Sequence, residues 1–249
     1  MQTISRQCVT ITRTPVQHER LKCEFVSNIS TYCGTADNVL LDSKLVQAAI
    51  AKLKCGKAPC IDGVTAEHVL HCHPTVSLHL LTLFNAMLKH SYVPPEFCTG
   101  TTIPLLKDSN LDSYNIDNYR AITISSILSK IFENCLLSRF NRYFETSDLQ
   151  CGFKAKAGCS EALLLLCSTV QYFTNNGSTV SFDKVNHYAL FLKLMERHVP
   201  MCLINLLANW YKNVFISVRW GPVSVKTGPP YYWCSSRWGT VPCTVCCIC

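Results

Sequence analysis

The chain has 249 residues, 48% of them hydrophobic, and its mean hydropathy is +0.15. These values exclude an intrinsically disordered chain and allow one sizeable core, or a domain and a half. The net charge of +7 is compatible with a nucleic-acid partner, but many proteins that bind none are as basic. No apolar run is long enough for a membrane span or a signal peptide, so we expect an intracellular protein, nuclear or cytoplasmic, without membrane association.

The chain contains 17 cysteines, which we interpret as reduced thiols because no secretory signal precedes them. Cys135 and Cys167 lie among apolar residues and are predicted to be small core residues. A further cluster consists of His68, His71, Cys72 and His73. A zinc site is the less favoured interpretation of this cluster, because no second pair of ligands stands at the spacing that a tetrahedral site requires.

The first part of the chain divides into an arm and a helix. Met1–Asn38 is polar and has no sustained hydrophobic period, which is typical of a linker or weakly ordered arm. Asp42 or Ser43 can then cap a helix that ends at Gly56. A second helix is expected to run from about Thr75 or Ser77 to Lys89, before two prolines.

The next segment presents two cations at fixed positions. Thr101–Leu106 is predicted to be a strand ending at Lys107, and Asp108–Asn118 is rich in residues that favour turns. Arg120 opens a second short strand, and a long amphipathic helix follows from Ser125. A lysine and an arginine held together suit a polyphosphate. The alternative from these residues alone is a solvated basic hairpin.

Downstream the pattern predicts more helices and a second hairpin. A basic loop contains Gly152, Phe153, Lys154 and Lys156, and a helix begins near Ser160. Further helices are predicted over His187–Arg197 and Met201–Phe215, and a hairpin over Ile216–Lys226 that turns at Trp220 and Gly221.

Several ordered motifs resemble one family. The first motif consists of P-L-x-K, a polar loop and then N-Y-R-x-I-x-x-x-S-x-x-x-K-x-x-E. In this chain its residues are Pro104, Leu105, Lys107, Asn118, Tyr119, Arg120, Ile122, Ser126, Lys130 and Glu133. A lead-in of Gly56, Lys57, Ala58, Asp62 and Gly63 has Cys60 where glycine is usual, and Asn85 and a Q-x-G-F block from Gln150 follow in order. Over roughly Leu40–Gly228 the chain therefore resembles the reverse transcriptases of LINE-type, non-long-terminal-repeat retrotransposons.

The resemblance implies an α+β, helix-rich fold: a truncated right-hand polymerase with fingers and an incomplete palm. The expected division is an arm over residues 1–40, the fingers region over 41–177, the incomplete palm over 178–227 and an aberrant tail over 228–249. RNA template, DNA primer, deoxynucleotides and Mg²⁺ are the implied partners. Lys107 and Arg120 would bind the nucleotide phosphates, and Phe153 and Lys154 would contact the template.

The catalytic aspartates are the point at which the chain departs from the family. The family pattern D-x-x-x-A-F-D-x-V-x-H is matched only in its second half, by Phe182, Asp183, Val185 and His187. The leading, metal-binding aspartate is missing, so we infer an internal deletion there, and no Asp-Asp pair occurs in the sequence. The alternative keeps Asp183 itself as the catalytic metal ligand at a strand end.

These departures predict a catalytically inactive fragment of an RNA-directed DNA polymerase. Two alternatives remain: a non-catalytic remnant that binds nucleic acid, and a decayed gene product without a function. The tail supports the interpretation as a decayed gene product. When Trp238–Cys249 is translated back into its possible codons and these are read one base later, the permitted residues include G-V-L-S-P-V-L-F-A-V-Y. This string resembles the next family block, so we expect a frame-shifted tail whose C-x-x-C pairs are not zinc ligands. Those pairs involve Cys243, Cys246, Cys247 and Cys249.

Overall fold

The computed structural model describes residues 15–34, 39–115, 118–144, 186–221 and 223–227, with single positions between 164 and 175. In chain order the elements are α1 (Pro15–Thr31), α2 (Ser43–Ala51), α3 (Ala66–Leu70), α4 (Val76–His90), η1 (Pro95–Cys98), β1 (Thr99–Leu106), β2 (Tyr119–Ser125), α5 (Ile127–Phe140), η3 (Asn141–Tyr143), α7 (His187–Glu196), α8 (Met201–Lys212), β3 (Phe215–Trp220) and β4 (Val223–Thr227). The α+β class predicted from the sequence is confirmed. None of the described helices is both long and apolar enough to cross a bilayer.

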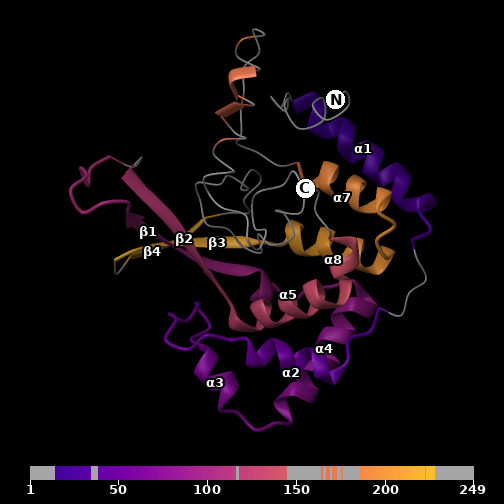
Figure 1. The fold of residues 1–249 in the computed structure, drawn as a ribbon, viewed down its shortest axis with the longest axis horizontal. Helices are drawn as coiled ribbons and strands as arrows, with labels where there is room; N and C mark the ends of the chain where they lie inside the picture. The colour runs from indigo at the N-terminus through magenta and orange to yellow at the C-terminus, as the bar shows by residue number, and fades with distance from the viewer. Residues whose placement is uncertain are drawn as a thin grey trace.

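The four strands form one mixed sheet in the order β2-β1-β3-β4. β1 pairs with β2 and β3 pairs with β4 in antiparallel hairpins, whereas β1 and β3 are parallel. Because β1 and β3 are parallel and each runs directly into a hairpin, both hairpin turns lie at the same end of the sheet. The helices gather around the other end, and the hairpin ends project from the helical body (Figure 1).

The helices form a stack in which several neighbouring helices are far apart in the sequence. α1 packs on α7, α7 on α8, α8 on α4, and α2 lies between α4 and α5. At the centre, the Phe132 ring of α5 lies 4.8 Å from Phe84 of α4 and 5.6 Å from Trp210 of α8, between ring centroids. These aromatic contacts join three helices into a single core. The core also includes Ile216, which anchors the sheet to the helices.

Most elements predicted from the sequence are confirmed, with ends shifted by a few residues. The strand expected at Thr101–Leu106 begins two residues earlier, and the helix expected to end at Gly56 ends at Ala51. Both downstream helices and the second hairpin are present, and its turn residue Gly221 has a φ of 58° that favours glycine.

The expectation of a linker over the first residues is wrong for Pro15–Thr31, which forms helix α1. Its buried face contains few apolar residues, so its sequence carries little helical periodicity. The helix is held by tertiary contacts: Phe25 is buried, with its ring centroid 5.4 Å from that of Phe191 and 5.8 Å from that of Tyr188 on α7.

Two side chains fix the chain at the start of α2. The Asp42 carboxylate caps this helix by accepting from the backbone N–H of Leu45 at 2.7 Å. Just before it, Asn85 of α4 accepts from the Leu41 N–H at 2.8 Å and donates to the Leu41 carbonyl at 3.2 Å. Asn85, which the sequence identifies only as part of a family motif, therefore binds both polar groups of a buried backbone unit.

Asn85→Ala is expected to lower the free energy of unfolding by about 2 kcal/mol, because it leaves both polar groups of Leu41 without this partner. Urea unfolding followed by circular dichroism measures the change. Thr82→Ala, at an exposed position of the same helix, is the matched control and should change stability by less than about 0.5 kcal/mol. Equal effects of the two substitutions would contradict the assigned role.

The cysteines divide into buried and exposed thiols. Cys135 is fully buried, which confirms its predicted place in the core, whereas Cys167 is exposed, so that prediction is wrong. Burial raises the pKa of Cys98 and of Cys135 to about 12, because the thiolate would lose its hydration. Both thiols are consequently protonated at neutral pH and unreactive in the folded chain.

At pH 8, iodoacetamide is expected to label the exposed Cys23 and Cys55 and to spare Cys98 and Cys135 until the chain unfolds. Since the folded-state pKa of the buried thiols lies above the ordinary value of 9.0, their contribution to stability is present below pH 9 and lost as the pH rises toward 12. Mass spectrometry of labelled peptides checks the first expectation, and urea unfolding across this pH range checks the second. Rapid labelling of Cys135 in the native chain would overturn the assignment.

Candidate nucleotide-binding face

In the described part of the loop between β1 and β2, polar side chains bond to nearby backbone. The Asp108 carboxylate accepts from the Asn110 N–H at 3.0 Å, and the Asp112 carboxylate accepts from the Tyr114 N–H at 2.9 Å. The Asn118 amide donates to the Asp112 carbonyl at 2.8 Å. These are the local bonds that Asp and Asn form in turns. They hold the two strand ends that carry the predicted site residues.

Lys107 and Arg120 lie on the same face of the sheet. Arg120 stands opposite Leu105 in the antiparallel register, and the backbone N–H of Lys107 donates to the Asn118 carbonyl at 2.9 Å. Lys107 is thus two residues beyond Leu105, on the side of the strand that Leu105 occupies. Such diagonal neighbours are roughly 7–8 Å apart. The structure therefore brings together the two cations that the sequence paired.

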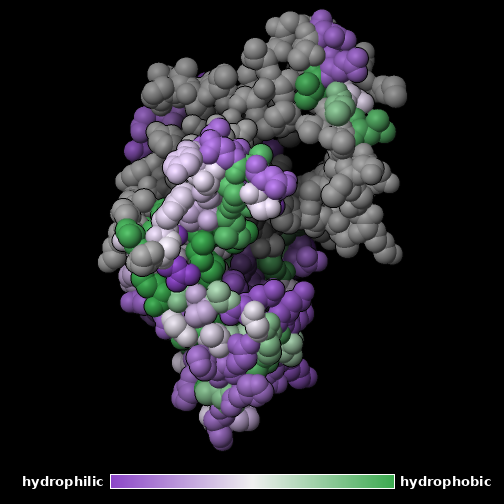
Figure 2. Space-filling model, turned by 90° about the vertical axis from the view of Figure 1, so that its left-hand side faces the viewer, coloured by the Kyte–Doolittle hydropathy of each residue, from purple (hydrophilic) through white to green (hydrophobic). Residues whose placement is uncertain are grey.

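Both cations are exposed, and so are the apolar side chains next to them. Leu105 is 49% and Ile122 is 41% exposed on this face. Figure 2 shows the molecule from the side toward which the hairpins project, where hydrophobic side chains run between hydrophilic ones. We call the surface formed by Lys107, Arg120, Leu105 and Ile122 the basic face. Its cations can donate charge-assisted hydrogen bonds to phosphate oxygens from the solvent side.

The lead-in motif secures the opposite end of these strands. Cys60, which replaces the usual glycine, is buried, and its thiol donates to the Ile124 carbonyl at 3.3 Å. Gly56 has a φ of 73°, and its N–H donates to the Glu67 carboxylate. This hydrogen bond is the main cause that lowers the pKa of Glu67. Gly56 and Cys60 are therefore structural: Gly56 bonds to α3, and Cys60 contacts the ends of β1 and β2 that lie away from the loop.

The remaining predicted site residues cannot be placed in this face. Phe153, Lys154 and Asp183 lie outside the described residues, as does the cysteine-rich tail. Among the described residues no group of three or more His, Cys, Asp or Glu side chains could hold a metal ion. The Mg²⁺ binding implied by the resemblance therefore stays a prediction. In the histidine cluster, the Nδ1 atoms of His68 and His73 lie within hydrogen-bonding distance of threonine hydroxyls.

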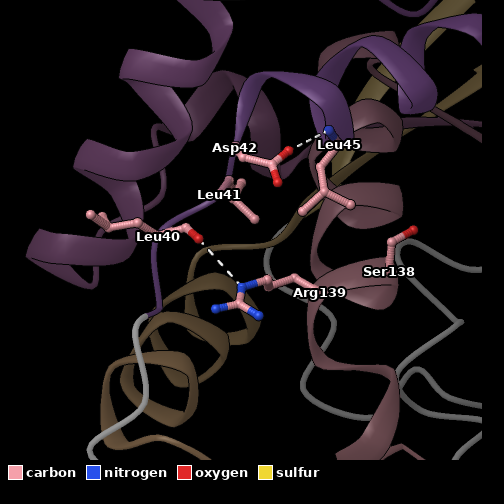
Figure 3. A pocket seen from close by; sticks show the side chains of 6 residues that line it. All are labelled: Leu40, Leu41, Asp42, Leu45, Ser138 and Arg139. Carbon is pink, nitrogen blue, oxygen red and sulfur yellow. Dashed lines mark hydrogen bonds between the residues drawn. The ribbon is translucent and has the colours of Figure 1, made fainter.

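An open pocket of about 510 Å³ lies elsewhere, between the start of α2 and the end of α5. Figure 3 shows that the Arg139 guanidinium in it is turned toward the Leu40 carbonyl, to which its Nε donates at 3.3 Å. The Asp42 carboxylate in the same pocket caps α2. An anion here would meet this carboxylate, and the Asp42 carboxylate and the Arg139 Nε already bond to backbone groups. The pocket is therefore a weaker candidate for a phosphate site than the basic face.

Comparison with known proteins gives three informative similarities. The chain is 27% identical over 153 residues, 60% of its length, to "RNA-directed DNA polymerase from mobile element jockey" of Drosophila funebris. It is 24% identical over 166 residues, 63% of its length, to "Retrovirus-related Pol polyprotein from type-1 retrotransposable element R1" of Bradysia coprophila. It is 26% identical over 94 residues to a protein of the element R1DM of Drosophila melanogaster.

The matched segment is a small part of each of these proteins. It covers 16% of the jockey and Bradysia proteins and 9% of the Drosophila melanogaster protein. No model of a known protein family matches the chain.

Proposed function

We propose, from its confirmed similarity to proteins of LINE-type non-LTR retrotransposons, that this chain is a fragment of an RNA-directed DNA polymerase. Its role within that activity is to bind the phosphates of an incoming deoxynucleotide on the basic face. The observation that carries the proposal is that Lys107 and Arg120 are both exposed on one face of a hairpin, as diagonal neighbours roughly 7–8 Å apart.

The chemistry of the two side chains suits this role. A triphosphate has several oxygens that can each accept a charge-assisted hydrogen bond, and an arginine fork can bind two of them at once. The polar turns that order the loop reduce the entropy lost when the ligand binds. The architecture proposed for residues 41–177 is the fingers part of a right-hand polymerase. The incomplete palm is proposed for residues 178–227, which include α7, α8, β3 and β4.

The proposed fragment binds its ligands without completing the reaction. Polymerases hold two metal ions with aspartates, and in this chain Asp183 is the single aspartate of the expected motif. When bound, Mg²⁺ would align the primer hydroxyl and neutralise phosphate charge, and Asp183 is the residue of this motif that would hold it. We therefore assign nucleotide and nucleic-acid binding to this chain and leave nucleotide transfer to a chain with the full set of aspartates.

Two assays on the purified chain test this proposal. Equilibrium dialysis with labelled deoxythymidine triphosphate is expected to give saturable binding that weakens as salt increases. Primer extension on an RNA template with Mg²⁺ is expected to give no product. Saturable binding with extension would disprove the inactive assignment, and the absence of binding by a folded chain would disprove the proposed function.

A further inference from the structure

A third exposed cation, Arg219 of β3, lies on the basic face. Thr101 and Ser217 are opposite each other in the parallel register, and their hydroxyl oxygens are 3.5 Å apart, so their side chains share a face. Arg219 is two residues beyond Ser217, and Leu105 is four residues beyond Thr101. Because side chains alternate along a strand, Arg219 and Leu105 point to this same face. The sequence does not identify Arg219, since its place depends on the pairing of β3 with β1.

This face is cationic without acidic residues in its strands. The sequences of the four strands, TGTTIPLL, YRAITIS, FISVRW and VSVKT, contain no Asp or Glu. The exposed side chains of Leu105 and Ile122, next to the cations, are apolar, and Phe215, which is 48% exposed, lies farther toward the helices on β3. A surface of separated cations with apolar side chains near them complements a single-stranded nucleic acid, which has phosphates along one edge and base or sugar faces along the other.

The strand register places Arg219 well apart from Arg120 on the sheet. Val218 is opposite Thr102, which places Arg219 beside Ile103, two strands across and two residues along from Arg120. With strands roughly 4.8 Å apart and a rise of about 3.3 Å per residue, the two arginine Cα atoms are about 12 Å apart. Arginine side chains are long, so Arg219 and Arg120, extended away from each other, can contact different phosphates along one nucleic-acid chain.

We propose that Arg219 binds the sugar–phosphate backbone of a single-stranded nucleic acid that crosses the basic face diagonally, from Arg219 past Leu105 toward Arg120. This inference rests on the proposed function for the nucleotide-binding role of Lys107 and Arg120. It adds a residue that binds the nucleic-acid strand. This residue lies on the β3–β4 hairpin, which is joined to the β1–β2 hairpin by the parallel pairing of β3 with β1. The two hairpins are held together at their ends by the rings of Tyr119 and Trp220, whose centroids are 4.9 Å apart.

The test measures the binding of a single-stranded nucleic acid and of a nucleotide to the same variants. Fluorescence anisotropy with a labelled oligouridine reports strand binding, and equilibrium dialysis with deoxythymidine triphosphate reports nucleotide binding. Arg219→Gln is expected to weaken oligouridine binding about tenfold at low salt and to reduce the slope of log K against log salt by about 0.7, the value for one phosphate contact in a single strand. It is expected to leave nucleotide binding unchanged. Arg219→Lys should retain the salt slope.

Arg20→Gln is the matched control, because Arg20 is an exposed arginine of α1, away from the sheet. The inference fails if Arg219→Gln and Arg20→Gln affect oligouridine binding equally, or if the folded wild-type chain binds nucleotide but no oligouridine. Loss of nucleotide binding in Arg219→Gln would also overturn it, since Arg219 would then belong to the nucleotide site. Absence of nucleotide binding by the wild-type chain instead defeats the proposed function, whatever the oligouridine result.

Discussion

Replacing Lys107 and Arg120 together by glutamine is expected to weaken deoxynucleoside triphosphate binding about a hundredfold or more. A hydrogen bond to a charged group contributes about 1.5–3 kcal/mol, and roughly 1.4 kcal/mol corresponds to a factor of ten in affinity. Each cation should thus contribute at least about tenfold. Equilibrium dialysis at low salt measures the loss, and the effect should shrink as salt screens the wild-type interaction.

The matched control is the double substitution Arg20→Gln and Lys89→Gln, which removes the same charge from exposed positions on α1 and α4. It lowers the overall positive charge equally but leaves the basic face intact. If both double variants bind the triphosphate with the same affinity, binding arises from the net charge of +7 and not from the hairpin. Circular dichroism of each variant confirms that the fold is retained.

Phe132→Ala is expected to lower the free energy of unfolding by about 3–5 kcal/mol. The Phe132 ring is fully buried and lies within 6.4 Å of the rings of Phe84, Phe97 and Trp210, between centroids. Its removal leaves a cavity where three helices meet, and neighbouring backbone can fill only part of it. Since a domain is stabilised by only about 5–15 kcal/mol, this single change can unfold a large fraction of the chain.

Urea unfolding followed by circular dichroism gives the size of the loss. Leu78→Ala, at a position 51% exposed on α4, should cost less than about 0.5 kcal/mol. A loss below about 1 kcal/mol for Phe132→Ala would show that the three helices do not share one core. The basic face depends on this core, because Ile216 of β3 is part of it.

The sequence predicted local elements well where one signal dominated. Asp and Asn side chains order the loop after β1 through bonds to nearby backbone, so the loop and both flanking strands could be predicted from adjacent residues. The paired position of Lys107 and Arg120 follows from the same hairpin. Helix α1 could not be predicted, because what stabilises it is the contact of Phe25 with α7, more than 150 residues later in the chain.

The sequence by itself thus determined the first hairpin, its two cations and the helices with a strong apolar period, since these depend on interactions within a few residues. Only the tertiary structure decided that β3 lies parallel to β1, which places Arg219 on the face of Lys107 and Arg120. It also decided that Asn85 holds Leu41 and that Cys60 contacts the sheet. The physical reason is that strand pairing and side-chain contacts between distant segments are selected by the packing of the whole core, for which no local sequence signal exists.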